Sequence, residues 1–519
     1  MSASPFRVES ALAAALLLLA GCGARGQVWT APLDVVGPVV SAGELVWVNR
    51  TAQVAEVLDP SGARAALGLD LSPSPRGVAA TPSGFVVTGG TGAAPRLDVV
   101  SLPDGAERAL AVAHVYDRVA VSPDGHFAVL WFDPSAPPAP GEPAARNNNE
   151  ITVVDLRAMR ATAVQLGTES VAPERVVFSP DPGVAAVILE GTVVFVDLSA
   201  PERRVQVPLK LSDGTLLRPE QEIFSPDGRY LYVRTDGSDD VLALDVVKTA
   251  QGLQSAVNFL FFPGAAGLQD IAVPAGAVFT RSVAALYADG SGGSTAALLD
   301  ATGDTSLTHA ASFAAPGAHL QDLGQGMLLV WSGSRAVAGW EPLRDRVDAD
   351  QLPAATVGAP LIGSGRAFFV HGAVGSGGDL STALTRVALS DDGSRLVLRQ
   401  SPLVLGGVPS ASAVDPAWGA VLLAIDVARA GSGAATAPDD AADRTGSVVT
   451  LRPDTLAIGG LVLDDTVTEM GVVGGFGFAV HPSPLGDVTF FSLRDPSRAS
   501  AHRVTGFLAG HLLDRGETP

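Results

Sequence analysis

A short segment that recurs along the chain constrains the fold more than any other feature. In its clearest form, Glu222 to Val246, an apolar run ends in Ser-Pro-Asp-Gly, an alternating run follows, and a second alternating run comes after another Asp-Gly turn. Asp-Gly after proline is typical of a tight turn, and period-two alternation is typical of a half-buried strand. The segment therefore predicts a small antiparallel meander. One meander cannot bury both of its faces, so it requires neighbours of the same kind.

Ten candidate units can be traced along the chain. Three are clear: Arg118 to Leu156, Arg175 to Leu198 and Glu222 to Val246. Fainter units begin near Val39, Val78, Ile271, Leu320, Ala359, Ala411 and Glu469. Their spacing of roughly forty to sixty residues is typical of four-stranded propeller blades.

We therefore predict an all-β chain, a β-propeller of about seven to ten four-stranded antiparallel blades, over residues 28–513. Three arrangements are compatible with ten units: faint units that merge into shared blades, an unusually large ring, or two rings. One continuous ring is favoured because no linker-like segment divides the chain.

The turn sequences SPDGRYLYV and SPDGHFAVL resemble those of the YVTN and TolB-like families of bacterial β-propellers, which are similar to WD40 rings. The likeness is specific in three units and weak in the others. It implies the fold and not an activity. The chain has no Trp-Asp dipeptide and no tryptophan-docking repeat of the quinoprotein kind. No cofactor is therefore expected.

The first thirty residues predict export. Ala11 to Ala20 is an apolar run that is too short to span a bilayer and has the length of a signal-peptide core. The following Leu-Ala-Gly-Cys resembles the lipobox of bacterial lipoproteins. That resemblance implies a signal peptide over residues 1–21, lipidation of Cys22 and a short tether over residues 22–27. Gly23, in place of Asp, implies the outer membrane of the cell envelope.

The alternative is an ordinary cleaved signal followed by an incidental cysteine. Cys22 is the only cysteine in the chain. An exported protein with a single thiol forms no internal disulfide, so this residue is either free or used for another purpose. Lipidation is therefore the favoured interpretation.

Charge and motifs exclude several function classes. The formal net charge of −20 disfavours nucleic acid and anionic lipid faces as partners. The histidines lack metal-ligand spacing, and no Gly-x-Ser-x-Gly elbow is present. Two aspartate clusters do not follow a calcium-loop spacing and are better interpreted as turns, so no metal site is predicted. The clusters are Asp236, Asp239, Asp240 and Asp439, Asp440, Asp443.

Five longer polar insertions fall between the second and third strands of their units. They cover residues 133–149, 236–239, 289–293, 373–380 and 428–446. All should emerge on one face of a propeller, and loops gathered on one face of a rigid scaffold commonly bind partners. The candidate interaction residues are Asn147, Asn148, Asn149, Asp439 and Asp440. The alternative is that these low-complexity segments are solvated connections without a partner.

Acidic residues recur where each innermost strand should begin. The positions are Asp117, Glu174, Glu220, Gln269 and Glu469. We expect them to form a partial acidic ring around one mouth of the channel, which would attract a cation or a basic peptide. The alternative is that they cap connections and face water.

Two functional hypotheses follow. The leading one is a non-catalytic, lipid-anchored scaffold of the bacterial cell envelope that binds a protein or an envelope polymer. The alternative is a lactonase-like propeller hydrolase whose site is built from the strand-start carboxylates at the channel mouth. The sequence contains no recognisable catalytic constellation, which favours the scaffold.

Overall fold

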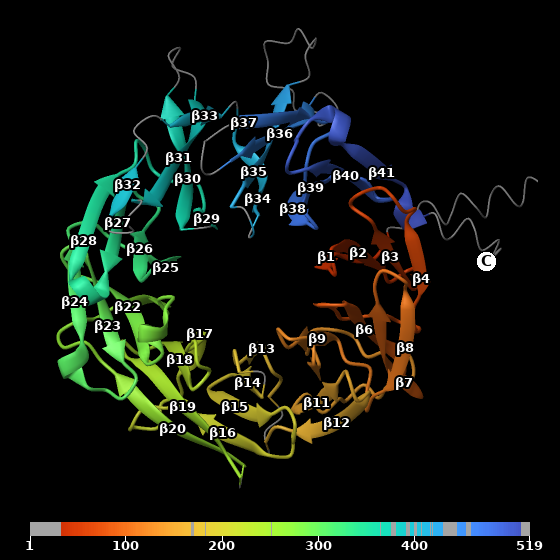
Figure 1. The fold of residues 1–519 in the computed structure, drawn as a ribbon. Helices are drawn as coiled ribbons and strands as arrows, with labels where there is room; N and C mark the ends of the chain where they lie inside the picture. Colours follow the sequence, from red (N-terminus) through yellow and green to blue (C-terminus); the bar gives the residue numbers. More distant parts are fainter. Residues whose placement is uncertain are drawn as a thin grey trace, which may run out of the picture.

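The chain folds into a single ring of ten β-sheets (Figure 1). A computed structural model describes residues 33–509, apart from positions 168–170, 182, 251, 364, 375–379, 391–394, 399–401, 406, 416, 418, 429–443 and 453–457. The sheets follow one another around the ring in sequence order. The predicted all-β propeller of four-stranded blades is confirmed, and the number of blades is ten.

The first five blades have these strands. Blade 1 has β1 (Val35–Ser41), β2 (Glu44–Asn49), β3 (Val54–Leu58) and β4 (Leu67–Asp70). Blade 2 has β5 (Val78–Thr81), β6 (Gly84–Thr91), β7 (Ala94–Ser101) and β8 (Ala106–Ala111). Blade 3 has β9 (Arg118–Val121), β10 (Phe127–Trp131), β11 (Glu150–Asp155) and β12 (Arg160–Gln165). Blade 4 has β13 (Arg175–Phe178), β14 (Val184–Leu189), β15 (Thr192–Asp197) and β16 (Arg204–Pro208). Blade 5 has β17 (Arg218–Phe224), β18 (Tyr230–Asp236), β19 (Val241–Thr249) and β20 (Gly252–Leu260).

The other five blades complete the ring. Blade 6 has β21 (Leu268–Ala272), β22 (Ser282–Ala288), β23 (Ser294–Asp300) and β24 (His309–Phe313). Blade 7 has β25 (His319–Gly324), β26 (Met327–Trp331), β27 (Ala336–Glu341) and β28 (Arg346–Gln351). Blade 8 has β29 (Leu361–Gly363), β30 (Arg366–Val374), β31 (Leu380–Leu389), β32 (Leu396–Leu398) and β33 (Leu403–Leu405). Blade 9 has β34 (Pro409–Val414), β35 (Val421–Ala428), β36 (Arg444–Leu451) and β37 (Ile458–Val462). Blade 10 has β38 (Glu469–Val473), β39 (Phe476–Val480), β40 (Asp487–Ser492) and β41 (His502–Thr505).

Every blade is an antiparallel meander whose strands pair in chain order. The first strand of each blade lies next to the central channel and the last lies at the rim (Figure 1). Blade 8 is a variation, because β32 and β33 each pair with a different part of β31 and share the outermost position. The ten predicted units correspond one to one to the ten blades.

Burial explains why the middle strands are so apolar. All five residues of β10, Phe-Ala-Val-Leu-Trp, are buried, whereas the rim strand β8 is exposed along most of its length. The middle strands are covered on both faces by neighbouring blades, so both sides must be apolar. Turns and rim strands carry the polar residues.

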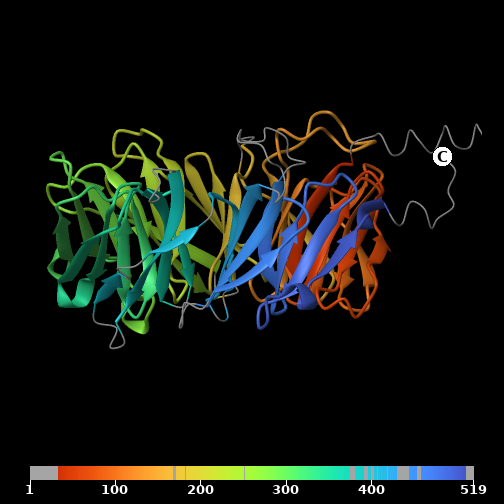
Figure 2. The same ribbon diagram turned by 90° about the horizontal axis from the view of Figure 1, so that it is seen from above.

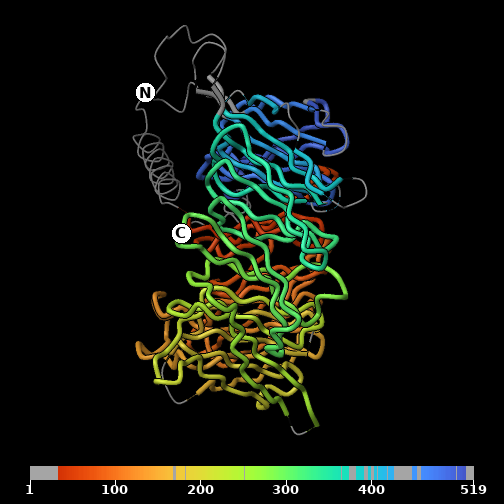
Figure 3. The backbone as a smooth tube through the Cα atoms, turned by 90° about the vertical axis from the view of Figure 1, so that its left-hand side faces the viewer, coloured from red at the N-terminus to blue at the C-terminus, as the bar shows by residue number. Residues whose placement is uncertain are grey.

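Ten apolar clusters account for ten contacts between neighbouring blades. Each cluster combines residues of two adjacent blades, and one of them joins blade 10 to blade 1. The ring is therefore closed by side-chain packing. Among residues 33–509 no strand from one end of the chain completes the blade at the other end. Figure 3 shows the ring edge-on, with the red first blade close to the blue last blades.

The contact between blades 10 and 1 is called the seam. A short segment after β41 packs into it. Phe507 to Ala509 form one helical turn and are buried. The Phe507 ring lies 4.8 Å from the ring of Trp47, centroid to centroid. The Asn49 side-chain amide donates a hydrogen bond of 3.0 Å to the carbonyl of Leu508. Both apolar and polar contacts therefore hold the two ends together.

The Ser-Pro-Asp-Gly segment is a turn between the first two strands of a blade. Ser225 Oγ donates to Asp227 and accepts from the Tyr230 amide, at 2.6 and 2.9 Å. Gly228 has φ of 72°, and a Cβ there would lie 2.2 Å from Ser179 Oγ of blade 4. Glycine is therefore required for both backbone conformation and space. The motif supports the fold, because its polar groups bind one another.

Helix is almost absent from the described residues. Besides the turn after β41, they contain the short 3-10 segments η1 (Ala277–Phe279), η2 (Thr305–Leu307), η3 (Pro342–Arg344) and η5 (Arg498–Ser500). Within the same part of the chain, no helix has the length and apolar character needed to cross a membrane.

His502 is a titratable residue packed at the seam. Its ring stacks on Phe490 at 5.2 Å and contacts the Asp59 to Gly62 turn of blade 1. Burial lowers the pKa of His502, although the nearby carboxylate of Asp59 acts in the opposite direction. A histidine whose pKa is lowered by folding binds protons more readily when unfolded, so its contribution to stability is lost as the pH falls below about 6.5.

We therefore expect His502→Phe to gain stability relative to the wild type as the pH falls from about 8 to about 5. The phenylalanine ring preserves the stacking and cannot be protonated. Urea unfolding of the two proteins at several pH values measures the difference. A gap between the two midpoints that does not change with pH would contradict this assignment.

Candidate functional site

One face of the ring carries the long connections, and we call it the loop face. In each blade it holds the connection from the second to the third strand and the connection to the next blade. The opposite face, the turn face, holds the short turns such as Ser-Pro-Asp-Gly. Figure 2 shows the connection between β10 and β11, in orange, rising above the upper edge of the ring. The predicted insertions at 133–149, 236–239 and 289–293 lie at second-to-third-strand connections, and the central parts of the other two, 375–379 and 429–443, lie outside the described residues.

The predicted acidic residues lie at the start of innermost strands. Asp117 and Glu174 directly precede β9 and β13, and Glu469 is the first residue of β38. Glu220 and Gln269 occupy positions where the pairing register shifts, in β17 and β21. A bulged residue is displaced from the regular ladder. Both side chains are exposed.

Arginines accompany most of these carboxylates. Glu174 lies 3.9 Å from Arg175 and 3.7 Å from Arg218. Glu220 forms an ion pair with Arg234. This mouth of the channel therefore carries both signs of charge and is not purely acidic.

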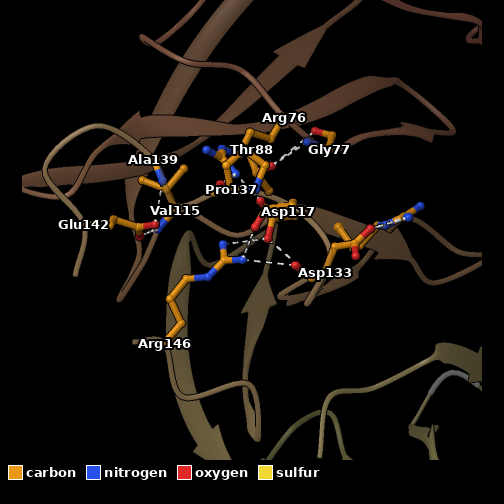
Figure 4. A network of polar contacts seen from close by, with 12 residues as sticks. Arg76, Gly77, Thr88, Val115, Asp117, Asp133, Pro137, Ala139, Glu142 and Arg146 are labelled. Carbon is orange, nitrogen blue, oxygen red and sulfur yellow. Dashed lines mark hydrogen bonds and ion pairs between the residues drawn. The ribbon is translucent and has the colours of Figure 1, made fainter. Parts of the chain in front are cut away.

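Asp117 differs from the others because it is buried at the centre of a network. One carboxylate oxygen accepts from Arg76, which comes from the connection between blades 1 and 2. The other accepts from Arg146 at 2.9 Å and from the Asp133 amide at 3.0 Å. Figure 4 shows the two guanidinium groups on opposite sides of Asp117. The side chains of Asp117, Arg76 and Arg146 are 5%, 16% and 7% exposed, so water competes weakly for these bonds.

The network fixes the path of the connection over residues 132–149, which we call the β10–β11 loop. Arg146 donates to the carbonyls of Asp133 and Ala136, at 3.0 and 2.6 Å, and its guanidinium lies over the Phe132 ring. Arg76 donates to the carbonyl of Pro137 at 2.7 Å. The loop is therefore an ordered part of the scaffold.

A second set of bonds holds the tip of the β10–β11 loop. The Glu142 carboxylate accepts from the Val115 amide at 2.9 Å and from the Ala139 amide at 3.1 Å (Figure 4). The Gly92 amide of blade 2 donates to the Pro140 carbonyl at 2.9 Å. The loop thus lies against blade 2 as well as blade 3. Charged groups and backbone bonds together hold it on the loop face.

Asp133 contributes a further fixed carboxylate. Hydrogen bonds from Ser135, together with the Arg118 guanidinium, lower the pKa of Asp133 to about 2. Arg118 binds one oxygen through Nε at 3.0 Å and Nη2 at 2.5 Å, and Ser135 binds the other. Both oxygens of this carboxylate are therefore engaged within the protein.

The asparagine run has a divided role. Asn149 is buried, and its amide donates a hydrogen bond to the carbonyl of Gly167. Asn147 is exposed and Asn148 is half-buried. The surface that this turn offers to a partner is therefore Asn147 and Asn148. The other predicted interaction residues, Asp439 and Asp440, lie outside the described residues.

The aspartates of blade 5 form a turn. Asp239 accepts from the amides of Gly267 and Leu268, at 2.7 and 3.3 Å, and so caps the connection into blade 6. Over the described part of the chain, no group of three or more His, Cys, Asp or Glu side chains is placed to hold a metal ion. The other aspartate cluster, including Asp443, lies outside that part.

A cavity of about 620 Å³ opens beside the Asp117 network. Its walls come from blades 1, 2 and 3, all on the loop face, and include Val36, Val78 and Val119 of the innermost strands. The charged lining residues are Arg50, Arg76, Arg118, Asp34, Asp117 and Asp133. A cavity of this size suits a small molecule or a few residues of peptide.

Sequence reasoning identified Asp117 and missed the arginines that bind it. Arg76 is 41 residues and Arg146 is 29 residues away along the chain. Both lie in connections without a repeated pattern, so no spacing relates them to Asp117. The one available signal was an arginine at the end of a long insertion that is otherwise poor in charge.

The sequence matches no protein-family model and no curated protein. Solved structures that are similar in fold include a eukaryotic initiation factor, with 14% identity, coverage of 84% of this chain and 97% of that chain, and a TM-score of 0.45. The WD40 domain of SCAP from fission yeast has 9% identity, coverage of 70% and 90%, and a TM-score of 0.37. The dihydro-haem d1 dehydrogenase NirN has 11% identity, coverage of 79% and 71%, and a TM-score of 0.39. These likenesses concern the propeller fold alone.

Proposed function

We propose that this chain is a non-catalytic, lipid-anchored scaffold of the bacterial cell envelope, and that its loop face binds a protein partner. The observation that carries the proposal is the ordered β10–β11 loop. Low-complexity connections are commonly solvated and unattached. This one is held by two arginines with little solvent exposure, a glutamate and contacts to two blades. An ordered loop loses less conformational entropy on binding than a free one.

The anchor is supported by the sequence of the leader. The apolar run before Cys22, and the absence of a second cysteine, fit a lipidated thiol. Several acyl chains together hold a protein on a membrane, whereas one chain binds only marginally. Twelve residues separate Cys22 from the start of β1 at Val35. At roughly 3.3 Å per residue, they place the ring within about 40 Å of the lipid surface.

Capture from the envelope tests the proposal. Tagged full-length protein, expressed in a Gram-negative host and chemically cross-linked, is extracted from the membrane and compared with Cys22→Ser. We expect the wild type to be acylated, membrane-bound and recovered with a discrete protein partner. The variant should be unacylated, leave the membrane fraction and lose the partner. A variant that stays acylated and membrane-bound would show that the predicted anchor is wrong.

A further inference from the structure

Arg50, which lines the cavity on the loop face, has one hydrogen-bond donor that the described part of the protein does not use. Arg50 donates through Nη2 to the carbonyl of Arg76 at 2.7 Å, and its Nη1 lies 3.5 Å from Asp34. Its Nε is buried and has no hydrogen-bond partner among the described residues. Buried donors without a partner are rare in proteins and call for an explanation. One such explanation is a ligand that supplies a hydrogen-bond acceptor to this donor.

The carboxylates of the cavity leave little room for a cation. Both oxygens of Asp117 accept bonds from arginines or backbone, and both oxygens of Asp133 accept bonds from Arg118 or Ser135. Asp34 is the remaining carboxylate, and its side chain is 64% exposed. A cation would have to displace existing bonds, whereas an anion would meet donors that are already present.

The local charge also favours an anion. Three arginines and three aspartates line the cavity, and Arg146 adds a fourth guanidinium behind Asp117. The site is therefore net positive, although the whole chain carries a charge of −20. At physiological ionic strength the rest of the charge is screened beyond roughly 8 Å, so the nearby guanidinium groups dominate.

The uncharged walls indicate what the anion is attached to. Val36, Val78 and Val119 come from β1, β5 and β9, which are end strands of their sheets. Each has one edge without a strand partner among the described residues, and this edge lies beside apolar side chains. Extended peptides use this combination of backbone bonds and small apolar contacts. None of the described residues that line the cavity is aromatic, so they offer no stacking platform of the kind that suits a sugar or a base.

We propose that the cavity binds the carboxylate of an extended peptide segment, with Arg50 and Arg118 as the groups that recognise it. The proposal rests on the proposed function, since the peptide would belong to the partner held on the loop face. The carboxylate is either an acidic side chain or a chain terminus. Both present the same two oxygens to a guanidinium.

Short peptides distinguish these sources. Fluorescently labelled acetyl-Val-Glu-Val-amide carries a side-chain carboxylate, acetyl-Val-Gln-Val with a free C-terminus carries a terminal one, and acetyl-Val-Gln-Val-amide carries none. Fluorescence anisotropy with the purified full chain measures each affinity. We expect one or both carboxylate peptides to bind at least about tenfold more tightly than the amide control. Inorganic phosphate, as a competitor, tests whether any anion suffices.

Two substitutions test the assigned residues. Arg50→Gln and Arg118→Gln each remove a guanidinium whose side chain is partly exposed, 34% and 60% respectively, so we expect both proteins to fold. Each should weaken binding of the preferred peptide about tenfold or more. Arg108→Gln, at an exposed position in the rim strand β8, is the matched control and should leave the affinity unchanged.

The proposal is overturned if no carboxylate peptide binds the wild type, or if the amide control binds equally well. It is also overturned if phosphate competes as strongly as the preferred peptide. A third contradicting result is that both arginine variants bind the peptide as tightly as the wild type does. These outcomes are separable from failure of the scaffold itself. If Arg50→Gln and the wild type capture a partner from the envelope equally well, the proposed scaffold function stands. The cavity would then have no part in binding that partner. Peptide binding without any captured partner would preserve the cavity and contradict the scaffold.

Discussion

Replacing Asp117 with alanine is expected to lower the free energy of unfolding by about 3 kcal/mol, because two arginines with little solvent exposure lose their shared carboxylate. Arg76 and Arg146 keep their bonds to backbone carbonyls, which limits the loss. The β10–β11 loop also loses the acceptor of the Asp133 amide. Urea unfolding measures the stability, and hydrogen exchange over residues 133–149 measures the order of the loop. Exchange in the loop should become faster.

Asp104→Ala is the matched control for this change. Asp104 lies on the turn face of blade 2, is exposed, and accepts one long bond of 3.4 Å from the Ala106 amide. We expect its loss to change stability by less than about 0.5 kcal/mol. If Asp117→Ala unfolds at the same urea concentration as wild type and leaves exchange in the loop unchanged, the network does not hold the loop.

The second large effect is expected at the seam. Phe507→Ala should destabilise the protein by about 3–5 kcal/mol, the range for a large aromatic residue removed from a core. The Phe507 side chain is buried between Trp47 of blade 1 and the apolar residues of blade 10. Among the described residues no strand is shared between blades 1 and 10, so no strand pairing compensates for the loss of this packing. Thermal and urea unfolding measure the effect.

Limited proteolysis shows where the damage lies. Cleavage of Phe507→Ala should begin near blades 1 and 10, because these blades lose their shared cluster first. Phe261→Ala is the control, since Phe261 follows the rim strand β20 and is 52% exposed. Equal stability of Phe507→Ala and the control would show that another contact closes the ring.

Most of the fold could be predicted from the repeat pattern. Apolar runs such as Phe127–Trp131 identify the strands that are covered on both faces, and the Ser-Pro-Asp-Gly turns locate the first hairpin of a blade. Even the faint units correspond to blades, because their buried strands still need apolar residues on both faces when the turn between them is unusual. The closure of the ring was not predictable in the same way. It depends on Phe507 and Leu508, which follow the last strand and belong to no repeat.

The candidate site was predicted less completely, for a physical reason. Strand register places Asp117, Glu174 and Glu220 at the starts of innermost strands, and that part of the prediction follows from the repeat. Their arginine partners come from the connections and from neighbouring strands, where the sequence of each blade is different. The expected acidic ring is thus a set of ion pairs at several positions. Contacts between connections of different blades leave no periodic signal in the sequence.

Site-specific photo-cross-linking tests the central claim, that the loop face binds a protein, most directly. A photoreactive amino acid is placed at Asn147, exposed on the loop face of blade 3, or at Ala158, exposed on the turn face of the same blade. Both proteins are irradiated in intact cells at matched expression. We predict a discrete protein adduct from position 147 and none from position 158. An adduct from position 158 alone, or no adduct from position 147, would contradict the account.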